Sequence, residues 1–207
     1  MQNETILYLA SASPRRREIL EKAGYQPVIV PADADESSVR FVPGDPCGYV
    51  KALAKLKNDA ARLQLSGCTE GIVLTADTVV VSDDSTPPLG KPRDRTEAVR
   101  MLSSLSGRTH RVITGVMLCD LADPANISLF SVSTEVRFRS LPEDEIAAYC
   151  DSPEPYDKAG GYGIQGAACI FVDSLCGDYY NVVGLPVCRV HEEILRMTAG
   201  KSSPDRK

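Results

Sequence analysis

Apolar positions along the chain follow two periods, and the change between them predicts alternating strands and helices. An apolar run covers Thr5–Ser11, and a helix is expected from Ser13 and Pro14, because Ser suits the N-cap and Pro the first turn. The helical stripe ends at Gly24, and Gln26–Pro31 forms a second apolar run. The first thirty residues therefore predict a strand, a helix and another strand.

The middle of the chain repeats this alternation with longer strands. An Asp-Pro pair at 45–46 predicts the start of a helix with apolar residues at helical spacing through Leu63. Gly71–Val81 is β-branched and apolar, and Asp94 and Glu97 have the spacing of a capping box that opens a further helix. Two adjacent strands are then expected at Thr109–Cys119 and Ile127–Arg137.

The last third predicts two more helices and one more strand. Ser140 and Glu143 form a second capping box, Ala167–Asp173 has the pattern of a strand, and Pro186 begins a final amphipathic helix. We therefore expect an α/β protein in which a mixed, twisted β-sheet is flanked by helices. No repeat or long linker marks a boundary, so one domain is expected over residues 1–200, with a flexible tail at 201–207.

Composition narrows the classes of function. The 207 residues are 43% hydrophobic and carry a net charge of −5, which excludes the basic surface of a general nucleic-acid binder. No apolar stretch resembles a signal sequence or approaches the roughly 20 residues that span a bilayer, so a cytoplasmic protein without a membrane partner is expected. Seven Cys without a C-x-x-C pair, and only two His, indicate reduced thiols and no zinc site.

Three consecutive arginines, Arg15, Arg16 and Arg17, occupy the first turn of the first predicted helix, where the helix dipole disfavours positive charge. With free backbone N–H groups and the hydroxyls of Ser11 and Ser13, they could hold an oxyanion such as a phosphate chain. The alternative is a solvated basic turn that pairs with acidic residues of the same helix. The preceding strand favours the anion site, because ligands of α/β proteins gather where strands end and helices begin.

Asp77 stands inside an otherwise apolar strand. A buried carboxylate is costly unless it is paired or metal-bound, so Asp77 either has a structural partner or lies at an exposed break in the strand. If it faces the anion site, it could hold a divalent cation or accept a proton from water, and Glu36 in the acidic turn could add an oxygen ligand. Structural pairing of Asp77 and simple solvation of the acidic turn stay open.

A glycine-rich run covers residues 157–166. It contains G-x-G-x-x-G but is followed by an apolar strand pattern, which excludes a dinucleotide-binding turn. The glycines imply a close approach of the backbone, either to a ligand or within a tight loop, and Gln165 could read the edge of a base. Lys91, in a stiff Gly-Lys-Pro turn, and Lys57, on a helix, are expected at the surface on spacing alone, and His110 and His191 are expected to be structural.

Taken together, eight short segments in this order resemble the Maf family of nucleoside triphosphate pyrophosphatases, over residues 7–196. The segments are Leu9-Ala10-Ser11-Ala12-Ser13-Pro14-Arg15-Arg16, Asp35-Glu36, Leu53-Ala54-x-x-Lys57, Ala76-Asp77-Thr78, Gly90-Lys91-Pro92, Thr114-Gly115-Val116, Glu154-Pro155-x-Asp157-Lys158-Ala159-Gly160-x-Tyr162-Gly163-Ile164-Gln165-Gly166 and Val183-Gly184-Leu185-Pro186.

The resemblance implies a Maf/ITPase-like fold with a central cleft and a homodimer. It also implies hydrolysis of a nucleoside triphosphate to the monophosphate and pyrophosphate, with a divalent metal such as Mg²⁺ or Mn²⁺. The Ser-Pro-Arg-Arg, Ala-Asp-Thr and Tyr-Gly-Ile-Gln-Gly segments are similar to the branch that acts on dTTP, UTP and modified pyrimidine nucleotides. The branch that acts on 7-methyl-GTP has Trp after the Pro, with Ser-Asp-Gln and Ser-Glu-Gly.

The resemblance also assigns roles by position. Asp77 matches the proton acceptor and Glu36 a further polar residue of the pocket, and the chemistry of their carboxylates makes both of them the candidate metal ligands. The positions tied to substrate choice are Arg15, Thr78 and Gln165, and the other substrate-binding candidates are Ser11, Ser13, Arg16, Lys57 and Lys91. The alternative function is a nucleotide-sensing regulator of cell division that binds without turnover, which the family's association with septum formation suggests. The retained carboxylates and cations favour turnover.

Overall fold

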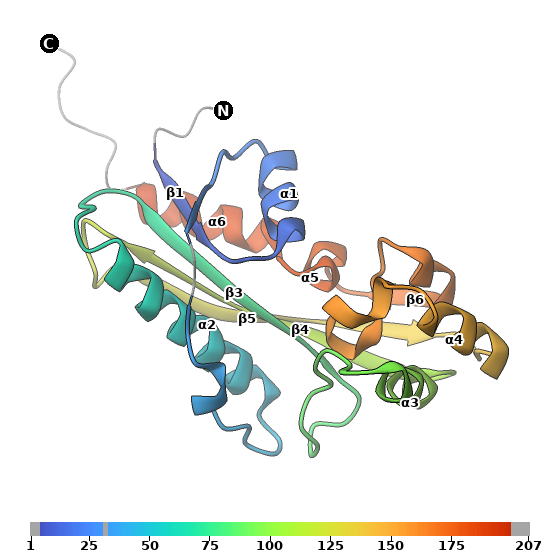
Figure 1. The fold of residues 1–207 in the computed structure, drawn as a ribbon. Coiled ribbons are helices and arrows are strands. Elements are labelled where there is room, and N and C mark those ends of the chain that lie inside the picture. The colour runs from blue at the N-terminus through green and yellow to red at the C-terminus, as the bar shows by residue number, and fades with distance from the viewer. Residues whose placement is uncertain (1–4, 31–32, 200–207) are drawn as a thin grey trace, which may run out of the picture.

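The strands of the chain form one mixed sheet, shown in Figure 1. A computed structural model describes residues 5–30 and 33–199, and within them the sheet has six strands. From one edge to the other they are β2 (Val28–Val30), β1 (Leu7–Ala10), β3 (Ile72–Val81), β4 (Thr109–Asp120), β5 (Ile127–Phe138) and β6 (Val172–Cys176). β1 is parallel to β2 and β3, and the remaining neighbours are antiparallel. The predicted α/β class with a mixed sheet is confirmed.

Helices cover both faces of this sheet. The long helix α2 (Pro46–Gln64) crosses β3 and β4 on one face, while α1 (Pro14–Lys22) and α6 (Val187–Thr198) pack on the other (Figure 1). The short helix α5 (Tyr179–Val183) precedes α6. At the far end of the sheet, α3 (Arg95–Leu105) and α4 (Glu143–Cys150) share an apolar cluster with β4 and β5.

Alternation along β3 decides which side chains meet which helix. Leu74 and Ala76 lie in the apolar cluster on the side of α1 and α6, while the hydroxyl of Thr75 donates to the backbone oxygen of Ala54 in α2 at 2.7 Å. Because successive strand residues point to opposite faces, Asp77 falls on the α2 side. The strand thus directs its one carboxylate toward α2.

Gly115 of β4 lets α2 approach the sheet closely. It pairs with Asp77 across the strands, and a Cβ at this position would lie 2.3 Å from the backbone oxygen of Val50. A real Cβ cannot be this close, so any larger residue would push α2 away from the sheet. The glycine therefore sets the distance between α2 and the strand that carries Asp77.

Two of the predicted elements are wrong in detail. Residues Ala167–Phe171 form a 3₁₀ helix rather than the start of a strand, because this turn buries Ala168 and Phe171, three residues apart, in one cluster. Ser140 does not cap α4, because Leu141 is buried in the core and Pro142 takes the N-cap position with φ of −61°.

Other structural points bear on the remaining sequence predictions. The helix α5 was not predicted. No helix within the described residues is both long and apolar enough to cross a membrane. The predicted tail at 201–207 lies outside the described residues, and the one-domain division stays a prediction.

Candidate active site

A cavity of about 760 Å³ lies where β1 ends and β3 continues. β1 pairs with β3 only as far as Leu9 and Leu74, so the rest of β3 runs past the end of its neighbour. Asp77 and Thr78 point to opposite faces of the sheet, but at this open edge both line the same cavity. The cavity therefore forms at a strand end next to the start of α1, the place where the sequence predicted an anion site.

All ten candidate residues line this one cavity, although they come from six separate segments of the chain. They are Ser11, Ser13, Arg15, Arg16, Glu36, Lys57, Asp77, Thr78, Lys91 and Gln165. Their chemical roles stay predictions. Spacing along the chain had left open whether these residues lie close together, and they do. The structure brings the basic turn, the strand carboxylate and the glycine-rich loop together.

Lys57 connects the two carboxylates of the site. Its Nζ forms an ion pair with Asp77 and lies 3.0 Å from Oε1 of Glu36. The side chains of Lys57 and Asp77 are only 12% and 15% exposed, so this pair is largely shielded from water. Asp77 is therefore paired, as its position inside an apolar strand required.

The expectation that Lys57 faces solvent was wrong, and the sequence contained the signal that corrects it. Residue 57 falls on the same face of the helix as Leu53, Ala54 and Ala61, which are all buried. A lysine on the buried face of an amphipathic helix needs a negative partner, and Asp77 lies opposite it on the sheet.

Glu36 and Asp77 are also the residues suited to a divalent cation. Both carboxylates already meet one positive charge, the Lys57 ammonium, and carboxylate oxygens are the ligands that Mg²⁺ and Mn²⁺ prefer. In the described part of the chain, no group of three or more His, Cys, Asp or Glu side chains could hold a metal. The donor set fits Mg²⁺ held by two carboxylates and completed by water and phosphate oxygens.

The three arginines of the basic turn have three different environments. Arg16 is buried and donates to Gly184 O at 2.9 Å, Ser11 Oγ at 3.0 Å and Thr78 Oγ1 at 3.1 Å. Burial lowers the pKa of Arg16, and the negative charge of Asp77 opposes this shift. Arg16 therefore holds α1, β3 and the α5–α6 connection together at the wall of the cavity.

Arg15 is bound across the cavity by Asp157. Its Nη1 lies 3.0 Å from Oδ2 of Asp157, whose Oδ1 lies 2.5 Å from Nζ of Lys158. Partial burial would raise the pKa of Asp157, but hydrogen bonds from Lys158 and Arg15 hold it below its ordinary value. Arg17 is exposed and pairs with Glu21 at 2.7 Å, so the solvated-turn alternative describes Arg17 alone.

A hydrogen-bond network between β4, β5 and α5, which the sequence did not reveal, supports the side chain of Thr78. Its Oγ1 lies 2.9 Å from Oγ1 of Thr114, which donates to the backbone oxygen of Asn181 at 3.1 Å. The side-chain amide of Asn181 donates to Val112 O and Thr134 Oγ1, both at 3.0 Å. These partners are separated by 36 to 69 residues in the chain, so no local pattern marks them.

The glycine-rich loop is anchored to two other walls of the cavity. Gly160 has φ of +71°, which favours glycine, and a Cβ at this position would lie 2.9 Å from Val80. The N–H of Gly160 donates to the backbone oxygen of Gly90 at 2.9 Å, next to the exposed Lys91. Tyr162 Oη lies 2.7 Å from Nε2 of His110. Burial lowers the pKa of His110 to about 4, so its imidazole is neutral at pH 7.

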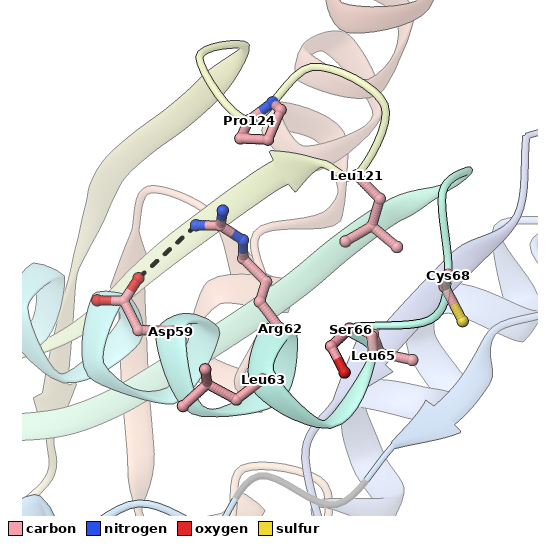
Figure 2. A pocket seen from close by; sticks show the side chains of 8 residues that line it. All are labelled: Asp59, Arg62, Leu63, Leu65, Ser66, Cys68, Leu121 and Pro124. Carbon is pink, nitrogen blue, oxygen red and sulfur yellow. Dashed lines mark ion pairs between the residues drawn. The ribbon is translucent and has the colours of Figure 1, made fainter.

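A separate hollow of about 380 Å³ lies at the carboxyl end of α2, and Figure 2 shows its lining. Arg62 Nη1 lies 3.9 Å from Oδ1 of Asp59 there, and Leu121 and Pro124 form the opposite side. None of the ten candidate residues lines this hollow.

Two of the proteins most similar to this chain carry the same name. The chain is 44% identical over 191 residues to a dTTP/UTP pyrophosphatase of Desulforamulus reducens, covering 92% of this chain and 95% of that protein. It is 47% identical over 186 residues to a dTTP/UTP pyrophosphatase of Moorella thermoacetica, covering 90% and 92%. The chain has a remote likeness to the solved structure of a HAM1 protein from Coxiella burnetii, with 13% identity, coverage of 96% of this chain and 100% of that one, and a TM-score of 0.43.

The family comparison agrees with the resemblance read from the eight segments. The model that describes Maf-like proteins matches residues 6–197, which include all ten cavity residues. The chain belongs to the Maf family.

Proposed function

We propose that this chain hydrolyses dTTP and UTP to the nucleoside monophosphate and pyrophosphate. The observation that carries the proposal is the position of the Asp77, Lys57 and Glu36 group in the same cavity as the Arg15–Arg16 turn. A polyanionic substrate needs neutralising cations, and a water nucleophile needs a base. Relatives named dTTP/UTP pyrophosphatase, which this chain matches over most of their length, support the same reaction.

Asp77 is the proton acceptor in this proposal. A water molecule attacks the α phosphorus, its proton passes to a carboxylate oxygen of Asp77, and the bond to the β-phosphate bridging oxygen breaks, so that pyrophosphate leaves with that oxygen. Lys57 fixes the orientation of the carboxylate through their ion pair. Positioned base catalysis of this kind contributes about 10²–10⁴-fold.

The cations of the cavity bind the triphosphate. Arg15 and Lys158 share Asp157, so a phosphate group can replace this carboxylate as their partner. Lys91 stands exposed on its stiff turn and adds a further positive charge at the cavity wall. Arg16 and Ser11 form the wall beneath them.

We assign Glu36 and Asp77 as the residues that hold a divalent metal, Mg²⁺ or Mn²⁺. When bound, the metal would neutralise charge on the phosphate oxygens and stabilise the leaving pyrophosphate. Gln165 supplies both a donor and an acceptor for the base edge, and Thr78 is held rigidly enough by Arg16 and Thr114 to contribute to substrate choice.

Pyrophosphate release separates this proposal from the regulator that binds without turnover. The purified chain with Mg²⁺ is offered dTTP, UTP, dATP, dGTP and modified pyrimidine triphosphates, and pyrophosphate is measured over time. Release that is fastest with pyrimidine triphosphates is expected, and binding without release from any of them would favour the regulator. The homodimer implied by the resemblance and the cytoplasmic location expected from the apolar pattern belong to the same proposal, and light scattering of the purified chain tests the first.

A further inference from the structure

The side chain of Glu154 lies inside the glycine-rich loop, with a donor on each side. Its Oε2 accepts a hydrogen bond from the backbone N–H of Ala167 at 3.0 Å, and its Oε1 accepts one from the hydroxyl of Tyr149 at 3.1 Å. Tyr149 belongs to α4 and is only 7% exposed. The carboxylate thus links Ala167, two residues after Gln165, to the buried Tyr149 of α4.

The side chains of Glu154 and Lys158 fill the space beside two glycines of the loop, Gly166 and Gly163. A Cβ on Gly166 would lie 2.0 Å from Oε1 of Glu154, and one on Gly163 would lie 2.6 Å from Cε of Lys158. Neither residue is among the glycines with positive φ, unlike Gly160 and Gly161. A side chain at Gly163 or Gly166 would therefore have to displace the end of Lys158 or of Glu154 from its present position.

Lys158 completes the packing inside the loop. Its Nζ donates to the backbone oxygen of Glu154 at 2.8 Å, and its side chain is only 17% exposed. On the opposite side of Gln165, Ile164 packs against the apolar cluster under α1 and α6. Both flanks of Gln165 are therefore fixed, while Gln165 itself is exposed and lines the cavity.

We propose that Glu154 is a positioning residue for base selection, because its carboxylate fixes the loop segment that presents Gln165 to the base. This inference rests on the proposed function for the identity of the ligand, while the contacts of Glu154 stand without it. The negative charge matters because two donors converge on the two oxygens. A glutamine at this position would turn its NH₂ group toward one of the donors and leave that donor without an acceptor.

The test compares Glu154→Gln with Glu143→Gln, a control that removes the same charge from an exposed position of α4. The first readout is the exchange rate of the Ala167 amide, measured by NMR. We expect about tenfold faster exchange in Glu154→Gln and no change in the control. Unchanged exchange in a folded Glu154→Gln chain would overturn the proposal.

The second readout is base preference in binding, which does not need turnover. Dissociation constants are measured for dUTP and dGTP that carry an imido bridge between the α and β phosphates. The preference for the pyrimidine should fall about tenfold in Glu154→Gln and stay unchanged in the control. In a Gln165→Ala background, Glu154→Gln should cause no further loss of preference, because both changes act on one contact.

The outcomes distinguish this inference from the proposed function. No pyrophosphate release by the wild-type chain from any nucleotide would contradict the function, whatever the binding preference does. Full pyrimidine preference in Glu154→Gln, with active wild type, would overturn the inference and leave the function in place. If Glu154→Gln does not fold, Tyr149→Phe removes one donor only, and it must lower the preference in the same direction; an unchanged preference there overturns the inference.

Discussion

The two parts of the cavity are built in different ways. The Asp77 and Lys57 pair stands on a long strand and a long helix, whose separation is set by Gly115 against the backbone of Val50. Gln165 stands on a loop of short 3₁₀ turns, held by Glu154 and by the anchors of Gly160. Regular elements thus fix the pair proposed for proton transfer, while a side-chain-supported loop fixes Gln165, one of the three residues proposed for substrate choice. We therefore expect changes at Gln165 to alter base choice without disturbing the Asp77 and Lys57 pair.

The largest expected effect tests the regular part. Asp77→Asn removes the proposed proton acceptor while keeping its size, so kcat should fall by about two orders of magnitude or more, with folding retained. Steady-state pyrophosphate release and thermal unfolding measure the two properties. Asp59→Asn, at a half-exposed position of α2 where the carboxylate pairs with Lys55, is the control and should leave kcat unchanged. Near-normal turnover by Asp77→Asn would remove the basis for the proposed mechanism.

A second effect follows from breaking the ion pair from the side of the helix. Lys57→Gln leaves two carboxylates facing each other without their shared cation, so kcat should fall about tenfold to a hundredfold. Lys55→Gln is a matched control, because Lys55 pairs with Asp59 at the surface of the same helix. Equal activities of the two variants would show that the buried position of Lys57 has no catalytic consequence.

A smaller effect should be confined to the loop. Gln165→Ala removes the polar contact to the base, so the ratio of kcat/KM for dTTP over dGTP should fall about tenfold while kcat for the remaining turnover changes little. Kinetics on both nucleotides measure the ratio. If the loop and the catalytic pair act separately, the effects of Gln165→Ala and Lys57→Gln add as free energies. A strong departure from additivity would contradict the separation of the two parts.

The smallest effect concerns the stability of the folded chain in acid, through His110, which contacts Tyr162 of the glycine-rich loop. His110 has an ordinary pKa near 6.5, which burial lowers to about 4 in the folded chain. The unfolded chain therefore binds a proton that the folded chain does not, and the free energy of unfolding falls as pH drops from 6.5 toward 4. The slope from this group is at most about 1.4 kcal/mol per pH unit. Urea unfolding at several pH values measures it, and His110→Gln should be less stable but flatter in this range.

The sequence predicted the strand and the helix of the regular part well, but not the burial of Lys57, and it predicted the loop part poorly. β3 and α2 were found because β-branched runs and helical spacing are local signals, and Asp77 was conspicuous in its strand. The short apolar run at Ala167–Phe171 was ambiguous, and tertiary burial of Phe171 decided in favour of a 3₁₀ turn. The contact of Arg15 with Asp157 joins residues 142 positions apart, which no periodicity can indicate.

Partners of the candidate residues were the least predictable feature. Thr78 was identified through the resemblance to the Maf family, but its supports Thr114 and Asn181 depend on sheet register and on the unpredicted helix α5. The contacts of Glu154 involve Gly166, and the sequence left open whether the glycines of this run approach a ligand or close a tight loop. The partners of these side chains therefore became known only from the packing of segments that are far apart in the chain.

Hydrolysis of dTTP in ¹⁸O-labelled water tests the central claim most directly. Attack on the α phosphorus, with Asp77 as proton acceptor, places the label in the phosphate of dTMP and leaves pyrophosphate unlabelled, and mass spectrometry of both products detects it. We expect one labelled oxygen in dTMP, formed by the wild-type chain and at a rate about a hundredfold lower by Asp77→Asn. Label in the pyrophosphate, or equal rates for the two chains, would contradict the proposed reaction.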